Sequence, residues 1–372
     1  MKKIAFGIFT TFCFTLNSFA QTFPCGSESK SGKAYIVSKQ MMQSRSVNVP
    51  YCARIYVTVF ADNNGNNRAA TDAAIMLQFN QMAVSYKPLG ICFMFMGIKQ
   101  VNNSDLLYQD KSEESELFPF LKEGMFNVFI HQTVTNGSNS LGGTSYDIPN
   151  TGRYCSLANN RLIVPNDNST MAHEVGHVLG LYHTFEKHPL DPFHGKESVE
   201  RNTTFFCYDC DVDGDLVCDT QADPDQDLAA NQASYLQAHT DANCVYNGTN
   251  VDECNLPYQP ATNNIMSYGR AECLTVLTTG QGDRMRGVIA NEPDLRAGMA
   301  DDNAIFGVPP LTYNSNDNYL NARDQLNTIG YIESTSSAYL QLQAKKIVIQ
   351  QNMKFSPGAG GRVVLKVFNG CD

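Results

Sequence analysis

The stretch HEVGHVLGLYH, residues 173–183, decides how the rest of the chain is interpreted. It has the pattern H-E-x-x-H-x-x-G-x-x-H. On a helix, residues four positions apart lie on one face, so His173 and His177 can hold the same metal ion. His183 lies beyond that face, and Gly180 can supply the turn that brings it back, because glycine adopts left-handed dihedral angles without a clash. Three neutral imidazoles suit zinc and leave its fourth position open for water.

Glu174 follows the first predicted ligand and need not bind the ion itself. A carboxylate in this place can take a proton from a water that zinc activates, so we expect Glu174 to be the general base. The alternative is a surface helix that carries three histidines by coincidence. The long motif fixes five residues at set spacings, which favours a metalloprotease.

The N-terminus has the pattern of a secretory signal peptide, residues 1–20. Lys2 and Lys3 precede an apolar core over residues 4–16, which is too short to span a bilayer, and small residues follow at the cleavage position. We expect the mature chain to start at Gln21 and to be exported. No later stretch is apolar for long enough to cross a membrane.

The chain is acidic, with a formal net charge of −10 over 372 residues. This excess disfavours nucleic acid and anionic membrane surfaces as partners. Length and composition predict a signal peptide over 1–20, an N-terminal extension or propeptide over 21–49, a protease domain over 50–300, a linker over 301–327 and a small β module over 328–372. For the module, a spacing or solubilising role and attachment to a surface or substrate both stay open. No prediction of oligomeric state follows.

The protease domain is predicted to be α/β, with a mixed, twisted sheet backing the zinc helix. The predicted strands are rich in β-branched and aromatic residues and cover 54–60, 92–98, 126–131 and 161–164. Apolar residues recur at helical spacing from Ile75 to Tyr86, with Thr71 as a cap and Pro88 and Gly90 as the end of the helix. The module is predicted to contain strands at 339–342, 347–350 and 363–368.

The long histidine motif resembles that of the metzincin clan of metalloproteases. That clan also has a methionine turn beneath the metal, and residues 263–269 (NNIMSYG) supply a candidate in Met266. Three features resemble the pappalysin branch of that clan: the stretch 173–185, the Gly-Asp…Asp-Thr pattern of residues 214–220, and Cys273. The resemblance is strong over about 162–288, architectural over 50–160 and absent in the tail. Gln221 departs from the branch, which often has proline there, and the insert between Phe185 and Cys207 is long.

This resemblance implies a metzincin catalytic domain, and the strand patterns of the tail add a small all-β module behind it. It implies a zinc endopeptidase that acts on proteins or peptides, with Glu174 returning its proton to the leaving amine. Tyr268 matches a family position near the metal, where it would bind zinc or hydrogen-bond the oxyanion; simple packing is its alternative role. Two other functions stay open: a metzincin of another branch, and a non-catalytic adhesin whose structural zinc would need a fourth protein ligand.

Twelve cysteines are present, and Cys13 leaves with the signal peptide. In an exported protein the remaining eleven should mostly form disulfides, and the odd count leaves at least one thiol free. Cys25 lies in the extension, so its thiolate could occupy the water position on zinc before processing; an ordinary disulfide is the alternative. A zinc site at the Cys207-x-x-Cys210 pair is less well supported, because no second ligand pair completes it.

Three disulfides are expected. The resemblance to the pappalysin branch, where the methionine-turn region is tied to an upstream loop, implies Cys244–Cys273. Cys254 should pair with one of three cysteines in the acidic loop, which are Cys207, Cys210 and Cys218. A Cys52–Cys92 bridge would join the start of the first strand to the start of the second.

The acidic loop suggests a second metal. Aspartates alternate from Asp209 to Asp215, and such crowded carboxylates repel one another unless they share a cation. Calcium accepts six to eight oxygen ligands in flexible geometry, and the pappalysin branch binds calcium around its corresponding loop. The candidate ligands are Asp213, Asp215, Asp219 and Thr220. The pattern is no complete EF-hand, because its twelfth position is Thr220, and a solvated loop without any ion is the alternative.

Overall fold

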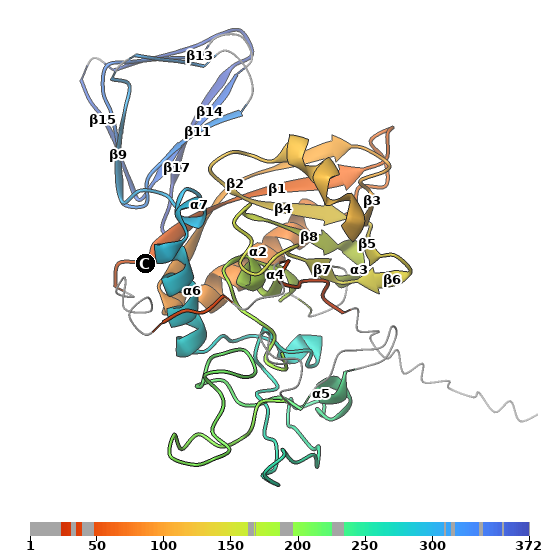
Figure 1. The fold of residues 1–372 in the computed structure, drawn as a ribbon. Helices are drawn as coiled ribbons and strands as arrows, with labels where there is room; N and C mark the ends of the chain where they lie inside the picture. Colours follow the sequence, from red (N-terminus) through yellow and green to blue (C-terminus); the bar gives the residue numbers. More distant parts are fainter. Residues whose placement is uncertain are drawn as a thin grey trace, which may run out of the picture.

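The computed structural model describes residues 24–30, 35–38, 48–162, 167, 169–186, 196–224, 234–308, 310–313, 317–334, 338–351 and 353–371. The predicted signal peptide and its cleavage site lie outside the described residues. Figure 1 shows a central α/β body, a lobe of irregular loops on one side of it and a triangular β unit on another. No helix among the described residues is both long and apolar enough to cross a membrane.

A five-stranded mixed sheet forms the centre of the body, in the order β2-β1-β4-β8-β7. β1 (Tyr51–Ala61), β2 (Ile91–Asn102), β4 (Phe126–His131) and β8 (Tyr154–Ala158) are parallel neighbours, and the edge strand β7 (Gly143–Thr144) is antiparallel to β8. β1 and β4 are buried on both faces, as apolar strands covered on two sides should be. The mixed sheet and three of its strands agree with the sequence analysis.

Helix α2 (Asp72–Tyr86) packs against this sheet and supports the zinc-motif helix α4 (Thr170–Val178). The Thr71 hydroxyl caps α2 by accepting from the Ala74 amide at 3.2 Å, as its position predicted. From the buried face of α2, the Tyr86 hydroxyl donates to the Ala172 carbonyl of α4 at 2.6 Å. The Gln78 side chain bonds the backbone at both Asp167 and Met171, at the start of α4. These bonds fix α4 relative to the sheet.

The predicted strand over 161–164 is corrected by the structure. Arg161 and Leu162 belong to a short helix, α3 (Asn159–Leu162), and residues 163–166 lie outside the described part of the chain. The last parallel strand of the sheet is β8, which ends just before α3. A run of only three apolar residues after an arginine fits a helical turn as well as a strand, and its length alone does not separate them.

Smaller elements complete the body and the loop lobe. They are β3 (Tyr108–Asp110), η2 (Lys111–Phe120), β5 (Thr133–Asn136), β6 (Asn139–Leu141), α5 (Tyr235–Ala238), η3 (Ala271–Cys273), α6 (Thr279–Asn291), α7 (Pro293–Arg296) and the 3-10 turn η1 (Lys87–Leu89). Between α4 and α6 the described chain has little regular structure. Its order comes in part from three disulfides, which are Cys207–Cys254, Cys210–Cys218 and Cys244–Cys273. The pairs of Cys244 and Cys254 are among those expected.

The C-terminal region is a small parallel β solenoid. Its nine strands are β9 (Asn303–Phe306), β10 (Leu311–Tyr313), β11 (Asp317–Asn321), β12 (Gln325–Thr328), β13 (Tyr331–Ser334), β14 (Tyr339–Ala344), β15 (Lys346–Ile349), β16 (Lys354–Pro357) and β17 (Arg362–Val367). They form three three-stranded sheets, one on each side of the triangle in Figure 1. Small and branched apolar residues such as Leu326, Leu340 and Leu342 fill its interior.

The linker predicted over 301–327 is replaced by the first rung of this solenoid. Each strand pairs with a strand one rung away, so Gln325 aligns with both Asn303 and Lys346. Such short strands pair with strands of the neighbouring rung and not with the next strand in a hairpin. The Asn- and Asp-rich turns between them have the composition of a linker, which explains the wrong prediction. The solenoid also packs on the body, where the Tyr319 and Tyr56 rings meet edge to face with centroids 6.0 Å apart.

A disulfide between Cys92 and Cys371 attaches the end of the solenoid to β2. It replaces the predicted Cys52–Cys92 bridge. Cys52 and Cys92 do face each other on the paired strands β1 and β2, but Cys371 reaches the same place and takes Cys92 as its partner. Cys52 remains a buried free thiol, together with Cys25 and the buried Cys155.

Candidate metal centre

The three motif histidines come together at the end of α4. His173 and His177 lie on one face of the helix, and the chain turns at Gly180, whose φ is 95°. The Leu181 amide donates to the Gly176 carbonyl at 2.9 Å across this turn, which satisfies a carbonyl that the ending helix leaves without a partner. The His177 Nε2 atom lies 3.1 Å from His173 Nε2 and 3.2 Å from His183 Nε2.

The ring orientations are set by hydrogen bonds on the other nitrogen. His173 Nδ1 lies 2.7 Å from the Ile265 carbonyl oxygen, and His177 Nδ1 lies 2.8 Å from that of Leu181. A carbonyl only accepts, so both Nδ1 atoms carry the proton and both Nε2 atoms present lone pairs. Burial lowers the pKa of His173 to about 3 and that of His177 well below its usual value, and the neighbouring His183 adds to both effects.

These histidines fit a zinc ion. Facing lone pairs of neutral imidazoles repel at these separations, and a cation placed among them removes the repulsion. Three histidine nitrogens around one position are typical of zinc sites, and the tautomers of His173 and His177 are fixed for this role. Burial, which disfavours the imidazolium form, keeps His173 and His177 in the state that binds a metal.

The predicted methionine turn packs against α4 beside His173. Ile265, at its start, provides the carbonyl that orients His173. Met266 is fully buried, and a Cβ atom added to Gly176 of α4 would lie only 2.7 Å from its sulfur. Glycine at position 176 therefore permits the close approach of this turn to the helix. The turn therefore packs against α4 at Gly176, and its role as the methionine turn of a metal site stays a prediction.

Glu174 is buried beside the histidines. Its Oε2 atom accepts a hydrogen bond from the Ser27 hydroxyl at 2.9 Å and from the Cys25 thiol at 3.4 Å. Burial raises the pKa of Glu174 to about 8, although these two hydrogen bonds lower it. Ser27 was not singled out in the sequence, because it lies in a polar segment without periodicity, 147 residues from its partner.

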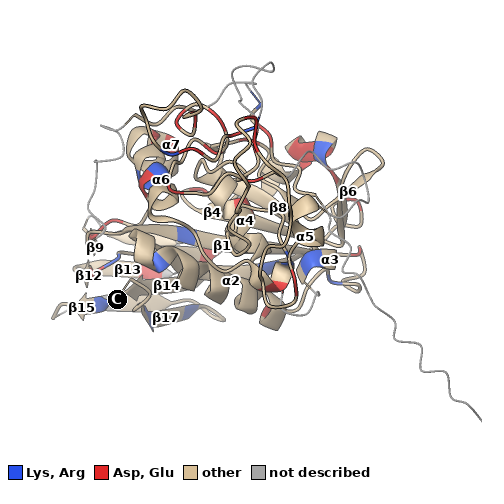
Figure 2. Ribbon diagram, turned by 90° about the horizontal axis from the view of Figure 1, so that it is seen from below, with Lys and Arg blue, Asp and Glu red and all other residues tan. Residues whose placement is uncertain are grey.

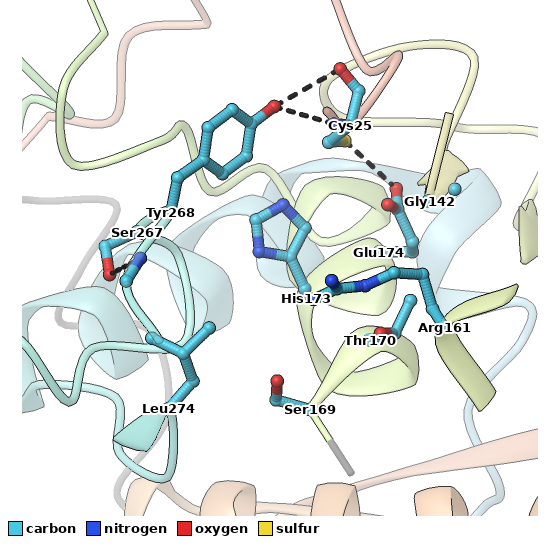
Figure 3. A pocket seen from close by; sticks show the side chains of 12 residues that line it. Cys25, Gly142, Arg161, Ser169, Thr170, His173, Glu174, Ser267, Tyr268 and Leu274 are labelled. Carbon is cyan, nitrogen blue, oxygen red and sulfur yellow. Dashed lines mark hydrogen bonds between the residues drawn. The ribbon is translucent and has the colours of Figure 1, made fainter. Parts of the chain in front are cut away.

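The N-terminal extension lies in the site. Figure 3 shows Cys25 between Tyr268 and Glu174. The Cys25 sulfur and one nitrogen from each of the three histidines all lie within 4.8 Å of one another. Backbone bonds hold this segment on the edge strand β7, since the Gly26 amide donates to the Gly143 carbonyl at 2.8 Å. Burial and the nearby Glu174 carboxylate raise the pKa of the Cys25 thiol in the absence of an ion.

Tyr268 lies on the other side of the same segment. Its hydroxyl accepts from the Cys25 amide at 2.7 Å and donates to the Cys25 carbonyl at 3.3 Å. Its ring meets the His183 ring with centroids 5.0 Å apart. Burial raises the pKa of the phenol well above its usual value, so the hydroxyl keeps its proton and can donate it in a hydrogen bond.

The candidate calcium ligands do not converge as the histidines do. Asp215 accepts from the Val217 amide at 3.0 Å and from the Thr220 hydroxyl at 2.8 Å. Asp219 instead accepts from Gly280 and Thr278 at the start of α6, both at 2.7 Å. Figure 2 shows acidic positions recurring along the loops beside α6.

Glu197, which packs against the acidic loop at Gly214, is a buried acid that the sequence analysis missed. Glu197 pairs with Arg201 at 2.6 Å, and burial, with Asp215 nearby, raises its pKa well above the usual value. Burial also raises the pKa of Asp215 to about 7. In the described chain, no three acidic residues of this loop bring one oxygen each to within 4.8 Å of one another.

This chain is similar in sequence to two extracellular metalloproteases. No family model matches it. An extracellular metalloprotease from Pyricularia oryzae is 27% identical over 252 residues, which cover 63% of this chain and 74% of the relative. An extracellular metalloprotease from Arthroderma gypseum is 24% identical over 245 residues, which cover 62% and 70%.

Solved structures of mirolysin from Tannerella forsythia are also similar. A promirolysin variant has a TM-score of 0.47 at 16% identity and covers 70% of this chain and 88% of its own. Mature mirolysin in complex with a cleaved peptide has a TM-score of 0.45 at 16% identity, with 67% and 95% covered. The two sequence relatives and the convergence of three histidine nitrogens together support a metalloprotease.

Proposed function

We propose that this chain is an exported zinc endopeptidase of the pappalysin type, which hydrolyses peptide bonds in proteins. One observation carries the proposal: three histidine nitrogens converge beside a buried carboxylate, Glu174. The extracellular naming of both sequence relatives supports export. Attachment to a cell surface through the solenoid stays a prediction.

His173, His177 and His183 would hold the zinc ion. When bound there, zinc supplies Lewis-acid chemistry, which activates water and polarises a carbonyl group. Glu174 takes the proton of the attacking water and then delivers it to the leaving amine. Its Oε2 atom now accepts hydrogen bonds from Ser27 and Cys25. Once this segment is removed, a water molecule could donate to the same oxygen.

Tyr268 is suited to stabilise the oxyanion that develops on the scissile carbonyl. A donor that is already oriented costs no rearrangement when negative charge appears. Its contact with the backbone of Cys25 supports this role, because a substrate peptide lying along β7 would come within reach of the same hydroxyl.

The extension is proposed to keep the enzyme latent. Residues 24–30 contact the metal ligands through Cys25, the general base through Ser27 and the oxyanion donor through the backbone of Cys25. A thiolate is a good zinc ligand, so Cys25 would take the position of the water. Processing of the extension would then start activity.

The adhesin alternative gains one observation. A structural zinc site needs four protein ligands, and Cys25 completes such a set with the three histidines. In that case the extension would be permanent and Glu174 would have no chemical task. The two functions therefore differ in what happens after the extension is removed.

The test is hydrolysis of casein by the full-length protein before and after limited proteolysis of its extension. We expect activity only after proteolysis, its loss with a chelator and its return with zinc. One tightly held zinc per chain without hydrolysis in either form would favour the adhesin.

A further inference from the structure

A small cavity lies between the start of α4 and the methionine turn, beside Glu174 and His173. Its volume is about 40 Å³, and Ser169, Thr170 and Leu274 form part of its wall. Figure 3 shows the Arg161 side chain crossing this cavity. Since Cys25 lies at the same cavity, a substrate residue next to the cleaved bond would reach it when the extension is absent.

Arg161 is held with its charge toward the cavity. Its side chain is only 11% exposed, and its Nη2 atom lies 2.8 Å from the Asp167 carboxylate, which is fully buried. Arg161 lines the cavity, whereas Asp167 does not. The Arg161 guanidinium therefore faces the cavity, and the Asp167 carboxylate lies on the side of the guanidinium away from the cavity.

Asp167 is fixed from the other side as well. Its Oδ1 atom accepts from the Ser169 hydroxyl at 3.3 Å and from the Thr170 hydroxyl at 3.4 Å, at the start of α4. A guanidinium has five N–H donors, and within the described part of the chain the ion-pair partner of Arg161 is the Asp167 carboxylate at Nη2. Because Arg161 lines the cavity, its remaining donors can bind a ligand there that accepts hydrogen bonds.

We propose that Arg161 selects substrates with a short acidic side chain at a position next to the cleaved peptide bond. This inference rests on the proposed protease function and specifies its substrate class. A carboxylate binds a guanidinium through charge-assisted hydrogen bonds, and a lysine or arginine of the substrate would meet a like charge. A cavity of about 40 Å³ has room for roughly three water molecules, which matches aspartate better than a long side chain.

The alternative is that the Arg161–Asp167 pair only stabilises the start of α4. Both roles predict that loss of the pair lowers the melting temperature. Only substrate selection predicts a change in the ratio of kcat/KM between acidic and neutral peptides, so this ratio is the decisive measurement.

The experiment uses processed, zinc-loaded protein and fluorogenic peptides that differ only in the two residues flanking the cleaved bond. Aspartate, asparagine, leucine and lysine are placed at each position in turn. At one of the two positions, we expect kcat/KM for aspartate to exceed that for asparagine by about tenfold, the size of one charge-assisted hydrogen bond. Lysine should be the poorest residue there.

Variants separate charge from folding. In Arg161→Gln/Asp167→Asn both charges are removed together, and the aspartate-to-asparagine ratio should fall to near one. Arg161→Lys keeps a positive charge and should keep part of the preference, which guards against loss of the double variant by unfolding. The ion pair of Arg68 and Asp72 at the start of α2 gives a matched control, Arg68→Gln/Asp72→Asn, which should keep the ratio of the parent.

Equal or lower rates for aspartate in the parent would overturn the inference, as would a folded double variant with the parent's ratio. In either case cleavage itself continues, so the protease function stands. If no peptide or casein is cleaved and a chelator has no effect, the protease function fails and this inference fails with it.

Discussion

Two groups of buried titratable side chains lie close to each other in the chain and differ in one respect. The histidine group points three Nε2 atoms at one position, with two of the opposite ring nitrogens bonded to carbonyl groups. In and beside the acidic loop, Asp219 bonds the start of α6 and Glu197 pairs with Arg201, so these two carboxylates turn to separate partners. Burial of like groups thus indicates a metal only where their lone pairs converge.

The largest expected effect is at Glu174. Glu174→Ala should lower kcat for peptide hydrolysis by at least about 10²–10⁴-fold, the usual contribution of a general base, and should leave about one zinc per chain. Zinc content by atomic absorption and turnover on one peptide are measured together. Turnover near that of the parent would show that Glu174 is not the base.

His183→Ala should weaken zinc binding by more than about 100-fold, since even the outer-shell partners of zinc ligands account for 10–100-fold. Competition with a chromogenic chelator measures the affinity. Asp215→Ala is the matched control from the aspartate loop and should keep zinc. If both variants bind zinc equally, the contrast between the two groups is lost.

Cys25→Ser should give the unprocessed protein measurable activity, because a hydroxyl is a weaker zinc ligand than a thiolate. The gain should be partial, since Ser27 still occupies Glu174. Ser27→Ala added to Cys25→Ser should raise it further. Peptide hydrolysis before any proteolysis is the measurement, and an unprocessed Cys25→Ser protein as inactive as its parent would refute the latency mechanism.

The smallest effect is expected for calcium. Asp215 has a pKa of about 7 in the folded protein, above its unfolded value of about 3.9. Its contribution to the free energy of unfolding is therefore full below about pH 4 and is lost as the pH rises through about 7. A bound cation favours the ionised carboxylate and should offset this loss. Zinc-loaded Glu174→Ala protein should therefore melt a few degrees higher in millimolar calcium at pH 8, with a smaller shift at pH 5.

Asp215→Asn is the control for this prediction and should remove both the calcium shift and part of the pH dependence. An unchanged melting temperature in the parent, with Asp215→Asn behaving identically, would favour the solvated loop. Calcium would then be absent from this group, which would sharpen its contrast with the histidines.

Prediction from the sequence worked where contacts are local. The spacing of His173 and His177 places both on one helix face, and Thr71 caps α2 through a residue three positions away. It failed where a partner lies far along the chain. Ser27 reaches Glu174, and Cys371 reaches Cys92, without any local pattern that marks them.

The solenoid shows a second physical reason why prediction from the sequence failed in places. A strand of four residues in a hairpin needs its neighbour nearby, but a solenoid strand such as β12 bonds to β9 and β15 one rung away. The polar turns at each corner then resemble a linker. A repeat of 22 and then 21 residues, seen in the alignment of Gln325 with Asn303 and Lys346, is the signal that would have identified it.

The Cys92–Cys371 disulfide closes a covalent ring that contains most of the protease domain and the whole solenoid. A single cut anywhere inside this ring opens it without releasing a fragment. A protease that nicks one of its own loops would therefore migrate as one species on a non-reducing gel and as two after reduction. The solenoid stays with the catalytic body after such damage for as long as this one bond remains oxidised.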